Sequence, residues 1–577
     1  MGVDHREAER AFRPARPRVS RLAELIGRIA AADVVWDFVG DDDVAVTGAC
    51  LDSRAVQPGD LYIALPGARA HGADFAEQAA SHGASAILTD ADGRGRAEAT
   101  GLPVLTADSV RDVVGRVSAE IYGTRPDAPE LLGVTGTNGK TTTTYLVRSL
   151  LRALGRSTGL VGTIEIVAGE TPIPSVLTTP EAPQLHGLMA RMREAGIGAA
   201  AMEVSSHSLD YRRVAGLSYR VAGFTNLTQD HLDLHGSMED YFATKAKLFA
   251  PDVAASAVVT VDDAWGRRLA AERRAAAGAD SLWTLETAAG ADRAAGAGSA
   301  PDAYDADWRV ERVERRGLGH AFELAGPEGR RLRASTGLPG RFNVSNAALA
   351  VLMVLASGAD AAALQRVLDD ADPLTIEVPG RMQVIATAPA AVVDFAHNSD
   401  ALERAIEAVR GERGGRVVVV FGATGDRDAT KRPVMGAVAA RQADVVIVTD
   451  DDPHGEEPGR IRAEVLAGAR EAVAAEGLAT EVIESAPRAA AIREAVRLAG
   501  PEDTILIAGR GHETVQEIAG VDHALDDRVE LRAALVEAGR DVLAEGASGR
   551  PGRRAEASAT GVETQSAGAE RVESTEP

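Results

Sequence analysis

Residues 133–151 read GVTGTNGKTTTTYLVRSLL, and this stretch predicts a buried strand, a glycine-rich turn and an amphipathic helix in that order. Glycines allow backbone N–H groups to curl around phosphate oxygens, and the N-terminus of the following helix adds its positive end. Lys140 can then neutralise the β- and γ-phosphates, and Thr141 can ligate Mg²⁺. The predicted ATP-binding residues of this loop are Gly136, Thr137, Asn138, Gly139, Lys140, Thr141 and Thr142.

The spacing of this loop departs from the general phosphate-binding pattern. The loop reads G-x-x-G-K-T-T, and Val134 stands where the form G-x-x-x-x-G-K-[ST] has its first glycine. A glycine-rich turn before an ordinary core helix is therefore the alternative. The order of strand, loop and helix favours the nucleotide site over that alternative.

The composition is that of an acidic globular chain with several domains. At 577 residues the chain is long enough for three or four domains of about 100–200 residues each. The net charge of −23 argues against a nucleic-acid partner, because phosphate neutralisation needs clustered lysines and arginines. Cys50 is the only cysteine, so the chain can form neither an intramolecular disulfide nor a thiolate metal cluster.

No stretch of the sequence resembles a signal peptide or a membrane span. The first twenty residues contain acids, arginines and prolines but no apolar core. No uninterrupted apolar run reaches the ~18 residues that a transmembrane helix needs. We therefore expect a cytoplasmic protein in which residues 1–20 form a disordered leader.

Alternating apolar runs and helical patterns predict an α/β fold of three domains. We expect a small α/β domain at residues 21–108, a central domain with a parallel sheet at 109–377 and a third α/β domain at 378–544. The third domain repeats the pattern of strand, loop and helix. Residues 280–302 are rich in alanine, glycine and aspartate and predict a flexible insertion, and residues 545–577 predict a disordered tail.

Two further strands of the central domain end in polar side chains. The segments AMEVSSH and FTNLTQDHLDLHG carry Glu203 and His231. Ligands of open parallel sheets bind at the carboxyl ends of the strands, so both residues are expected beside the phosphate loop. A carboxylate and an imidazole there could complete the coordination of Mg²⁺ around ATP. Taken alone, Glu203 could instead be a satisfied buried acid, and His231 could be a helix cap.

Ten motifs together give the chain a family resemblance. They are GTNGKTT, MEVSSH, FTNLTQDHLDLHG, YFATKAKLF, GRFNVSNAALA, PGRM, DFAHNSDAL, FGATGDRD, KRP and GRGHE. In order and spacing the chain resembles the Mur ligases over residues 51–528, most of all those that add the third residue of the peptidoglycan stem peptide. The resemblance implies a small N-terminal UDP-binding α/β domain, a central P-loop ATPase-like domain and a C-terminal Rossmann-like domain that binds an amino acid.

The resemblance also implies ATP-driven amide formation. The γ-phosphate of ATP would pass to the side-chain carboxylate of D-glutamate in UDP-MurNAc-L-Ala-D-Glu, and the amine of an incoming amino acid would displace it. Lys140 and Thr141 would bind phosphate and Mg²⁺, expected as two ions, and Glu203 and His231 would also hold metal. Lys245, in YFATKAKLF, matches a lysine that the family carries as a carbamate, whose anionic oxygens can bridge to the metal.

Further residues match the family's substrate contacts. On the nucleotide side these are Asn343, Asn346 and Arg381, together with Asp394 and His397 of DFAHNSD. On the side of the UDP-linked dipeptide they are Leu51, Ser53, Ala68, Arg69, Ala70, Thr178, Thr179, Ser205, Tyr211 and Arg213. Tyr211 stands where related sequences often have glutamine, so its role is open. The permanent charge and planar fork of Arg213 suit an anionic substrate.

The acceptor amino acid is expected at three strand ends of the third domain. The expected contacts are Arg427, Asp451, Asp452, Pro453, His454, Gly509 and Glu513. Family members that add meso-diaminopimelate read D-N-P-R in the second loop, whereas this chain reads D-D-P-H. An imidazole is a weaker substitute for a bidentate guanidinium. We therefore expect a diamino acid with one carboxylate, such as lysine, ornithine or diaminobutyrate, with diaminopimelate as the alternative.

Two other classes of protein could carry the same phosphate loop. A folylpolyglutamate synthetase shares the ligase architecture but would not need the LDSR-containing N-terminal domain. A P-loop switch would bind nucleotide only to change conformation. In the favoured interpretation the partners are small molecules, namely ATP, the UDP-linked dipeptide and an amino acid, and the enzyme is a monomer without nucleic-acid partners.

Overall fold

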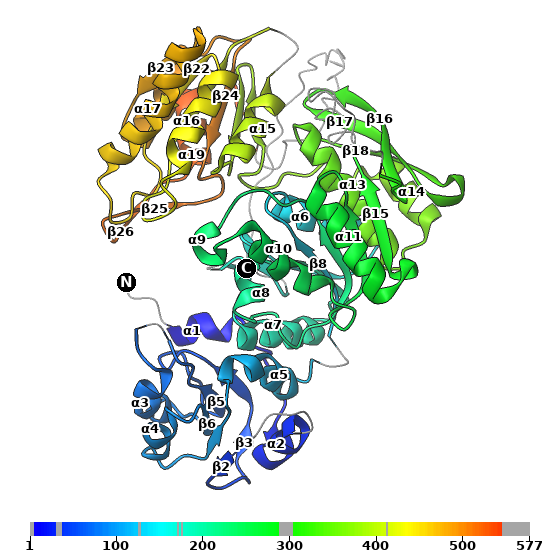
Figure 1. The fold of residues 1–577 in the computed structure, drawn as a ribbon, viewed down its shortest axis with the longest axis vertical. Coiled ribbons are helices and arrows are strands. Elements are labelled where there is room, and N and C mark those ends of the chain that lie inside the picture. The colour runs from blue at the N-terminus through cyan, green and yellow to red at the C-terminus, as the bar shows by residue number, and fades with distance from the viewer. Residues whose placement is uncertain are drawn as a thin grey trace, which may run out of the picture.

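The computed structural model describes residues 5–30, 37–67, 69–124, 128–169, 172–174, 177–287, 304–410 and 414–544. These residues form three successive α/β units, and the central unit lies between the other two (Figure 1). Among the described residues, no helix has both the length and the apolar composition needed to cross a membrane. The predicted insertion at 280–302 lies mostly outside the described residues, and the predicted tail at 545–577 lies entirely outside them.

The first unit is a five-stranded sheet in the order β2-β7-β6-β5-β4. Its strands are β2 (Asp37–Val39), β4 (Gly48–Cys50), β5 (Asp60–Ile63), β6 (Ala86–Thr89) and β7 (Val104–Thr106), with the two-stranded pair β1 (Ser20–Arg21) and β3 (Ala45–Val46) beside it. Its helices are α2 (Leu22–Ala30), α3 (Ala76–Ser81), α4 (Arg94–Glu98) and α5 (Val110–Tyr122). The apolar face of α5 packs into the core of this unit, beyond the boundary predicted at residue 108.

The central unit is built on an eleven-stranded sheet in the order β11-β10-β9-β12-β8-β13-β14-β15-β16-β17-β18. Its strands are β8 (Glu130–Thr135), β9 (Thr158–Val161), β10 (Glu165–Val167), β11 (Ile173–Pro174), β12 (Ala199–Glu203), β13 (Tyr219–Phe224), β14 (Ala254–Thr260), β15 (Leu282–Glu286), β16 (Trp308–Arg316), β17 (Gly319–Ala325) and β18 (Arg331–Thr336). Strands β9, β12, β8, β13, β14 and β15 run parallel, and β16–β18 form an antiparallel extension.

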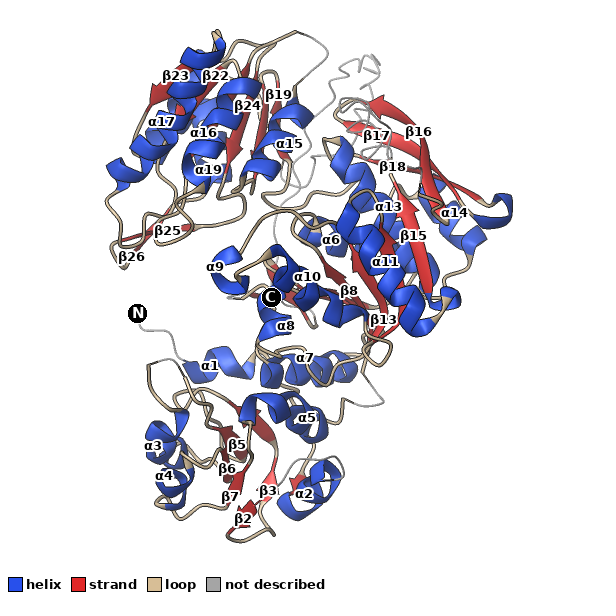
Figure 2. Cartoon of the chain, in the orientation of Figure 1, coloured by secondary structure: helices blue, strands red, loops and turns tan. Residues whose placement is uncertain are grey.

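Helices cover both faces of this central sheet (Figure 2). They are α6 (Lys140–Ala153), α7 (Ala182–Glu194), α8 (Ser206–Asp210), α9 (Leu232–His235), α10 (Met238–Ala246), α11 (Ala264–Ala277), α13 (Arg341–Ala356) and α14 (Ala361–Asp370). Helix α13 is apolar around its whole circumference and is buried against α6 and the sheet, as expected for a helix without a polar face. Strand β8 is buried from Leu131 to Thr135, so the loop that follows it starts from a rigid position.

The third unit is a six-stranded sheet in the order β19-β20-β24-β21-β22-β23, in which only the edge strand β19 is antiparallel. Its strands are β19 (Gln383–Thr387), β20 (Ala390–Asp394), β21 (Val417–Phe421), β22 (Val445–Val448), β23 (Glu481–Glu484) and β24 (Thr504–Ala508), followed by the hairpin β25 (Val515–Ile518) and β26 (Val521–Ala524). Its helices are α15 (Ser399–Val409), α16 (Lys431–Gln442), α17 (Pro458–Glu476), α18 (Arg488–Leu498) and α19 (Asp527–Glu537). The carboxyl ends of its parallel strands therefore share one edge.

The leader predicted at residues 1–20 is ordered from His5, so the expectation of disorder is wrong for the described part. Helix α1 (His5–Arg10) and the segment after it lie between the first unit and α7 (Figure 1). Arg13 donates to both oxygens of the buried Asp60 at 2.5 and 2.9 Å. The backbone N–H of Ala15 donates to Glu194 of α7 at 2.6 Å. Arg13 and the backbone of Ala15 thus connect the segment to two units.

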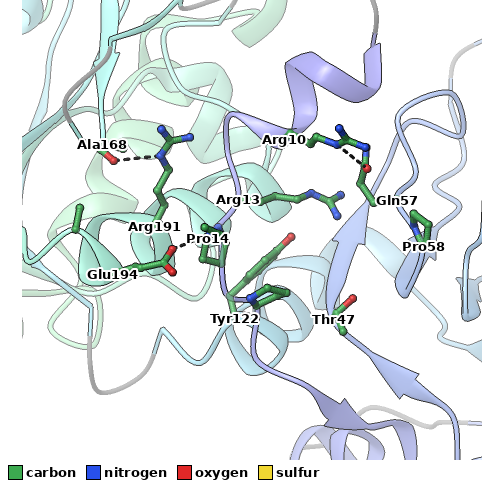
Figure 3. Close-up of a pocket in the computed structure, with 14 residues that line it drawn as sticks. Arg10, Arg13, Pro14, Thr47, Gln57, Pro58, Tyr122, Ala168, Arg191 and Glu194 are labelled. Atoms are coloured by element: carbon green, nitrogen blue, oxygen red, sulfur yellow. Dashed lines mark hydrogen bonds between the residues drawn. The ribbon is translucent and has the colours of Figure 1, made fainter.

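A cavity of about 580 Å³ lies beside this segment (Figure 3). Its charged side chains already have partners. Arg10 donates to Gln57, and Arg191 donates to the carbonyl oxygen of Ala168 at 3.2 Å. We assign no ligand to this cavity.

Candidate functional site

A cleft with a volume of about 750 Å³ lies between the central and third units. Most of the predicted catalytic and nucleotide-binding residues line it. Those that line it are Thr137, Asn138, Gly139, Lys140, Thr141, Thr142, Thr178, Glu203, Ser205, Arg213, His231, Lys245, Asn343, Asn346, Arg381, Asp394, His397, Arg427 and Glu513. Residues from Thr137 to Glu513 thus converge on one space, as the strand-end rule predicts.

The phosphate loop has the backbone that anion binding requires. Gly139 has φ +90° and precedes the first residue of α6, so the free N–H groups of that helix face the loop. A Cβ at Gly139 would lie 2.3 Å from Asn346 Oδ1, so a side chain there would have to displace the Asn346 amide. Lys140 Nζ donates to the carbonyl oxygens of Gly136 and Thr137 at 3.1 and 2.8 Å. Burial lowers the pKa of Lys140, so a phosphate that replaced these carbonyls would restore its charge.

Glu203 is completely buried and lies next to the phosphate loop. Thr141 Oγ1 donates to Glu203 Oε2 at 2.9 Å, and the backbone N–H of Thr163 donates to Oε1 at 2.8 Å. A carboxylate and a threonine hydroxyl in contact are the oxygen ligands that Mg²⁺ prefers. The donor set therefore fits a magnesium ion bound with ATP.

Lys245 is buried in the same wall, with 1% of the residue exposed. Its Nζ donates to the carbonyl oxygen of Gly136 at 2.9 Å and lies 4.5 Å from the centre of the Tyr241 ring. Burial, followed by repulsion from Lys140, holds the pKa of Lys245 well below its usual value. A neutral amine is the form that adds to CO₂, so the surroundings of Lys245 fit the carbamate implied by the family resemblance.

His231 lies at the mouth of the cleft, directly before α9. Its backbone is left-handed, with φ +52°, and its ring meets the ring of His207 edge to face at 4.9 Å between centroids. Burial lowers the pKa of His231 to about 4, against the opposing effect of Asp230. A neutral imidazole at pH 7 can act as a metal ligand.

Asp230 is a candidate functional residue that the sequence reasoning missed. Its carboxylate lies 3.9 Å from Nε2 of His397 in the third unit. Burial alone would raise the pKa of Asp230, but His397, His231 and nearby lysines together lower it. A second contact between the units joins Asn138 Nδ2 to Asp400 Oδ2 at 3.2 Å. The position of Asp230 beside His231 in QDHLDLHG was the available signal.

Arg381 and Glu513 lie in the wall of the cleft that the third unit contributes. The Arg381 guanidinium lies 4.2 Å from the centre of the Phe395 ring and donates to His512 Nδ1 at 3.3 Å. Burial and then the neighbouring Asp451 carboxylate raise the pKa of Glu513 to about 8, against the opposing effect of Arg510. Glu513 is thus largely a neutral acid at pH 7 unless a cation binds beside it.

The loop after β22 lies at the same sheet edge, but its residues do not line the cleft. His454 has φ +47°, and its Nδ1 contacts Glu517 Oε2 of the β25–β26 hairpin at 2.8 Å. Asp452 pairs with the fully buried guanidinium of Arg510. Oxygens of Asp451, Asp452 and Glu513 lie within 4.8 Å of one another, and Arg510 already provides a cation among them. This acidic group therefore needs no metal ion.

The predicted contacts to the UDP-linked dipeptide divide between two places. Thr178, Ser205 and Arg213 line the cleft, and Arg213 pairs with Glu181 at 2.8 Å. Thr179 is buried beneath them and donates to the backbone of Glu203, whereas Tyr211 is 39% exposed outside the cleft. Leu51, Ser53, Arg69 and Ala70 belong to the first unit, away from the cleft, and Ala68 lies outside the described residues.

These elements define the class of protein. A phosphate loop, a buried carboxylate and a buried lysine face a second α/β domain across one cleft, as in an ATP-dependent enzyme that acts between two domains. Three family models match the chain: the Mur ligase family catalytic domain at residues 45–122, the Mur ligase middle domain at 134–354 and the Mur ligase glutamate ligase domain at 380–511. The chain belongs to the Mur ligase family and is an ATP-dependent ligase.

Similar proteins indicate which members of the Mur ligase family the chain resembles. A UDP-N-acetylmuramyl-tripeptide synthetase of Leifsonia xyli subsp. xyli is 45% identical over 92% of this chain and 99% of its own length. A UDP-N-acetylmuramoyl-L-alanyl-D-glutamate–2,6-diaminopimelate ligase of Streptomyces avermitilis is 45% identical over 91% of this chain and 98% of its own. A solved structure with the latter name has a TM-score of 0.60 at 29% identity and covers 91% of this chain and 100% of its own. The predicted family and the three-domain α/β fold are confirmed.

Proposed function

We propose that the protein joins meso-2,6-diaminopimelate to the D-glutamate side chain of UDP-MurNAc-L-Ala-D-Glu in peptidoglycan synthesis. The observation that carries this proposal is the 45% identity, over 91% of the chain, to a relative named as a 2,6-diaminopimelate ligase. The acceptor with one carboxylate that we expected from His454 has less support, because relatives at 42–45% identity carry the diaminopimelate name. The family assignment leaves no support for a switch that only binds nucleotide.

The residues of the cleft divide the first chemical step among them. The phosphate loop and Lys140 would hold the triphosphate of ATP, and Asn343, Asn346 and Arg381 would contact its nucleoside side. Magnesium bound at Thr141, Glu203 and His231 would neutralise charge on the phosphates. Lys245 as a carbamate would add an anionic ligand. Arg213, which lines the same cleft, would bind the anionic substrate, whose carboxylate oxygen would attack the γ-phosphorus and release ADP.

In the second step the amine of the acceptor attacks the carbonyl carbon of the acyl phosphate, and inorganic phosphate leaves. Arg427 is exposed at the cleft and would pair with an acceptor carboxylate. Glu513 would bind the distal ammonium. We propose that the first unit binds the UDP group through Leu51 and Ser53. We also propose that the enzyme acts as a monomer in the cytoplasm on small-molecule substrates.

A diamino acid with one carboxylate is the second candidate for the acceptor, and one observation favours it. His454 stands at the position of the family's second-carboxylate arginine, yet its imidazole contacts Glu517 and does not line the cleft. Arg427 is then the only predicted acceptor contact that carries a cation into the described cleft. The single guanidinium of Arg427 can pair with the one carboxylate of such an acceptor.

A panel of amino acids separates the two acceptors. Purified protein with ATP and UDP-MurNAc-L-Ala-D-Glu would receive diaminopimelate, lysine, ornithine or diaminobutyrate in turn, and mass spectrometry would identify the product. The proposal expects diaminopimelate to have the highest kcat/KM. A higher kcat/KM for any of the other three would replace the proposed acceptor by the second candidate.

The affinity for the acceptor should depend on pH through Glu513. With a pKa of about 8, the carboxylate form rises from roughly 3% at pH 6.5 to roughly 75% at pH 8.5, while the acceptor ammonium stays charged. Because only the anion attracts an ammonium strongly, KM for the acceptor should fall about tenfold over this range. KM for ATP, measured in parallel, should change little.

The Glu513→Gln variant is the control for this pH effect. Glutamine has a similar shape but no titratable carboxyl group, so KM for the acceptor should be high and nearly constant from pH 6.5 to 8.5. A fall of the same size in the variant would show that another group causes the pH effect.

A further inference from the structure

Arg488 is a buried cation beneath the two loops that flank the proposed acceptor site. It is the first residue of α18, and its side chain is completely buried, as is that of its partner Asp527 at the start of α19. Nε and Nη2 of Arg488 each donate to an oxygen of Asp527 at 2.7 Å. Neither residue lines the cleft, so neither contacts a substrate there.

The same guanidinium also connects two strand ends that are not neighbours. Nη1 of Arg488 donates to the carbonyl oxygen of Asp450 at 3.0 Å, two residues after β22. Nη2 donates to the carbonyl oxygen of Ala508 at 2.8 Å, at the end of β24. Strand β21 lies between these two strands in the sheet, and its pairing with them ends at Ile507 and Val448, before the residues that Arg488 contacts.

These two carbonyls come directly before two residues that the sequence predicts at the acceptor site. Asp451 follows Asp450, and Gly509 follows Ala508. The loops meet closely there, because a Cβ on Gly509 would lie 2.6 Å from Asp451 Oδ2. A change in the separation of the two strand ends would therefore move Asp451 relative to Glu513, four residues beyond Gly509.

An arginine is needed for this connection. Four donor positions of one planar group are used at once, two on the carboxylate and one on each carbonyl. A lysine has three donors from a single atom and cannot span the same distances. Stability alone would not require a charged pair here, since replacing a buried ion pair by apolar side chains of similar volume is often neutral or stabilising.

We propose that Arg488 and Asp527 are positioning residues for the acceptor amino acid, because they fix the distance between the loops after β22 and β24. The pair acts through Asp451 and Glu513, so it should affect acceptor binding and not the binding of ATP or the UDP-linked dipeptide. This inference rests on the proposed function only for the location of the acceptor site.

A double variant tests the proposal without leaving a buried charge unpaired. Arg488→Met with Asp527→Leu removes both charges and both carbonyl contacts while retaining side-chain volume. We expect KM for the acceptor to rise about tenfold or more, as when a residue that orients ligand-binding residues is removed. KM for ATP and for the UDP-linked dipeptide should stay within about twofold of wild type. Far-UV circular dichroism and the thermal midpoint should remain near those of wild type.

A matched pair on the same two helices serves as the control. Arg493 of α18 and Glu530 of α19 lie 3.3 Å apart but are partly exposed. Arg493→Met with Glu530→Leu should leave all three KM values near those of wild type. An unchanged acceptor KM in a folded Arg488→Met/Asp527→Leu variant, or equal rises in all three KM values, would overturn the positioning role.

A third variant grades the effect. Arg488→Lys keeps the charge opposite Asp527 but cannot reach both carbonyls, so its acceptor KM should lie between those of wild type and the double variant. An acceptor KM equal to that of wild type would show that charge alone is sufficient and would overturn the bridging role. Failure of the proposed function would look different, because the wild-type protein would then form no product with diaminopimelate.

Discussion

Replacing Lys140 with methionine is expected to lower the rate of ligation about a thousandfold or more, since one preorganised charge on the phosphates is lost. Methionine retains most of the apolar stem, so α6 should still pack and the fold should persist. The ammonium of Lys140 is held by the carbonyls of Gly136 and Thr137, within reach of whatever occupies the phosphate loop. The measurement is the formation of ADP and of ligated product at saturating ATP.

Lys247 offers a matched control for Lys140. It is an exposed lysine of the same unit, next to the helix that carries Lys245. Lys247→Met removes the same charge from the surface and should leave the rate within about twofold of wild type. A Lys140→Met variant with more than a tenth of wild-type activity would contradict the assignment of the phosphate loop.

Replacing Lys245 with alanine is expected to reduce activity about a hundredfold or more, because a proposed ligand of the metal centre is lost. Short carboxylates such as acetate or propionate should restore part of that activity by occupying the space of the missing carbamate. The physical basis is the burial of Lys245 and its depressed pKa, which favour reaction of the neutral amine with CO₂.

The carbamate can also be detected without any turnover. Wild-type protein prepared with carbon-13 bicarbonate should show a carbamate carbon signal that Lys245→Ala lacks. Lys247→Ala should keep both the signal and the activity. If wild-type protein gives no signal, and acetate does not restore activity to Lys245→Ala, Lys245 acts as an amine and the carbamate proposal fails.

The strand-end rule predicted the central part of the site from the sequence. Lys140, Glu203 and His231 come from three separate segments, yet all line one cleft, whereas Lys245 was predicted from the family resemblance alone. The phosphate loop was predictable because its glycines let the backbone curl around phosphate, and this requirement is visible in the local sequence. Which residue contacts a buried acid depends on the tertiary structure. The contact between Glu203 and Thr163 could therefore not be predicted from either segment alone.

Side-chain direction at the acceptor loop was not predictable. The sequence places His454 after β22, but its contact with Glu517 depends on a hairpin 63 residues later. The ordered leader was missed for a similar reason. Arg13 looks like a solvated charge until the buried Asp60 of another segment pairs with it. Both cases show long-range pairing overriding a local pattern.

The acceptor was the least predictable part of the function. His454, taken as the residue that determines specificity, favoured an acceptor with a single carboxylate. Relatives similar over about nine-tenths of the chain favour diaminopimelate. The proposed contact of Glu513 with a distal ammonium is the same for either acceptor. The two classes of acceptor differ in the second carboxylate. We therefore expect the choice between them to depend on the residues that contact this group.

The most direct test of the central claim follows oxygen from substrate to phosphate. UDP-MurNAc-L-Ala-D-Glu would be labelled with heavy oxygen in the side-chain carboxylate of glutamate and turned over once with ATP and diaminopimelate. Ligation through an acyl phosphate predicts one heavy oxygen in the released inorganic phosphate, one left in the new amide, and ADP as the other product. Phosphate without the label would mean that water attacks ATP and would contradict the ligase mechanism.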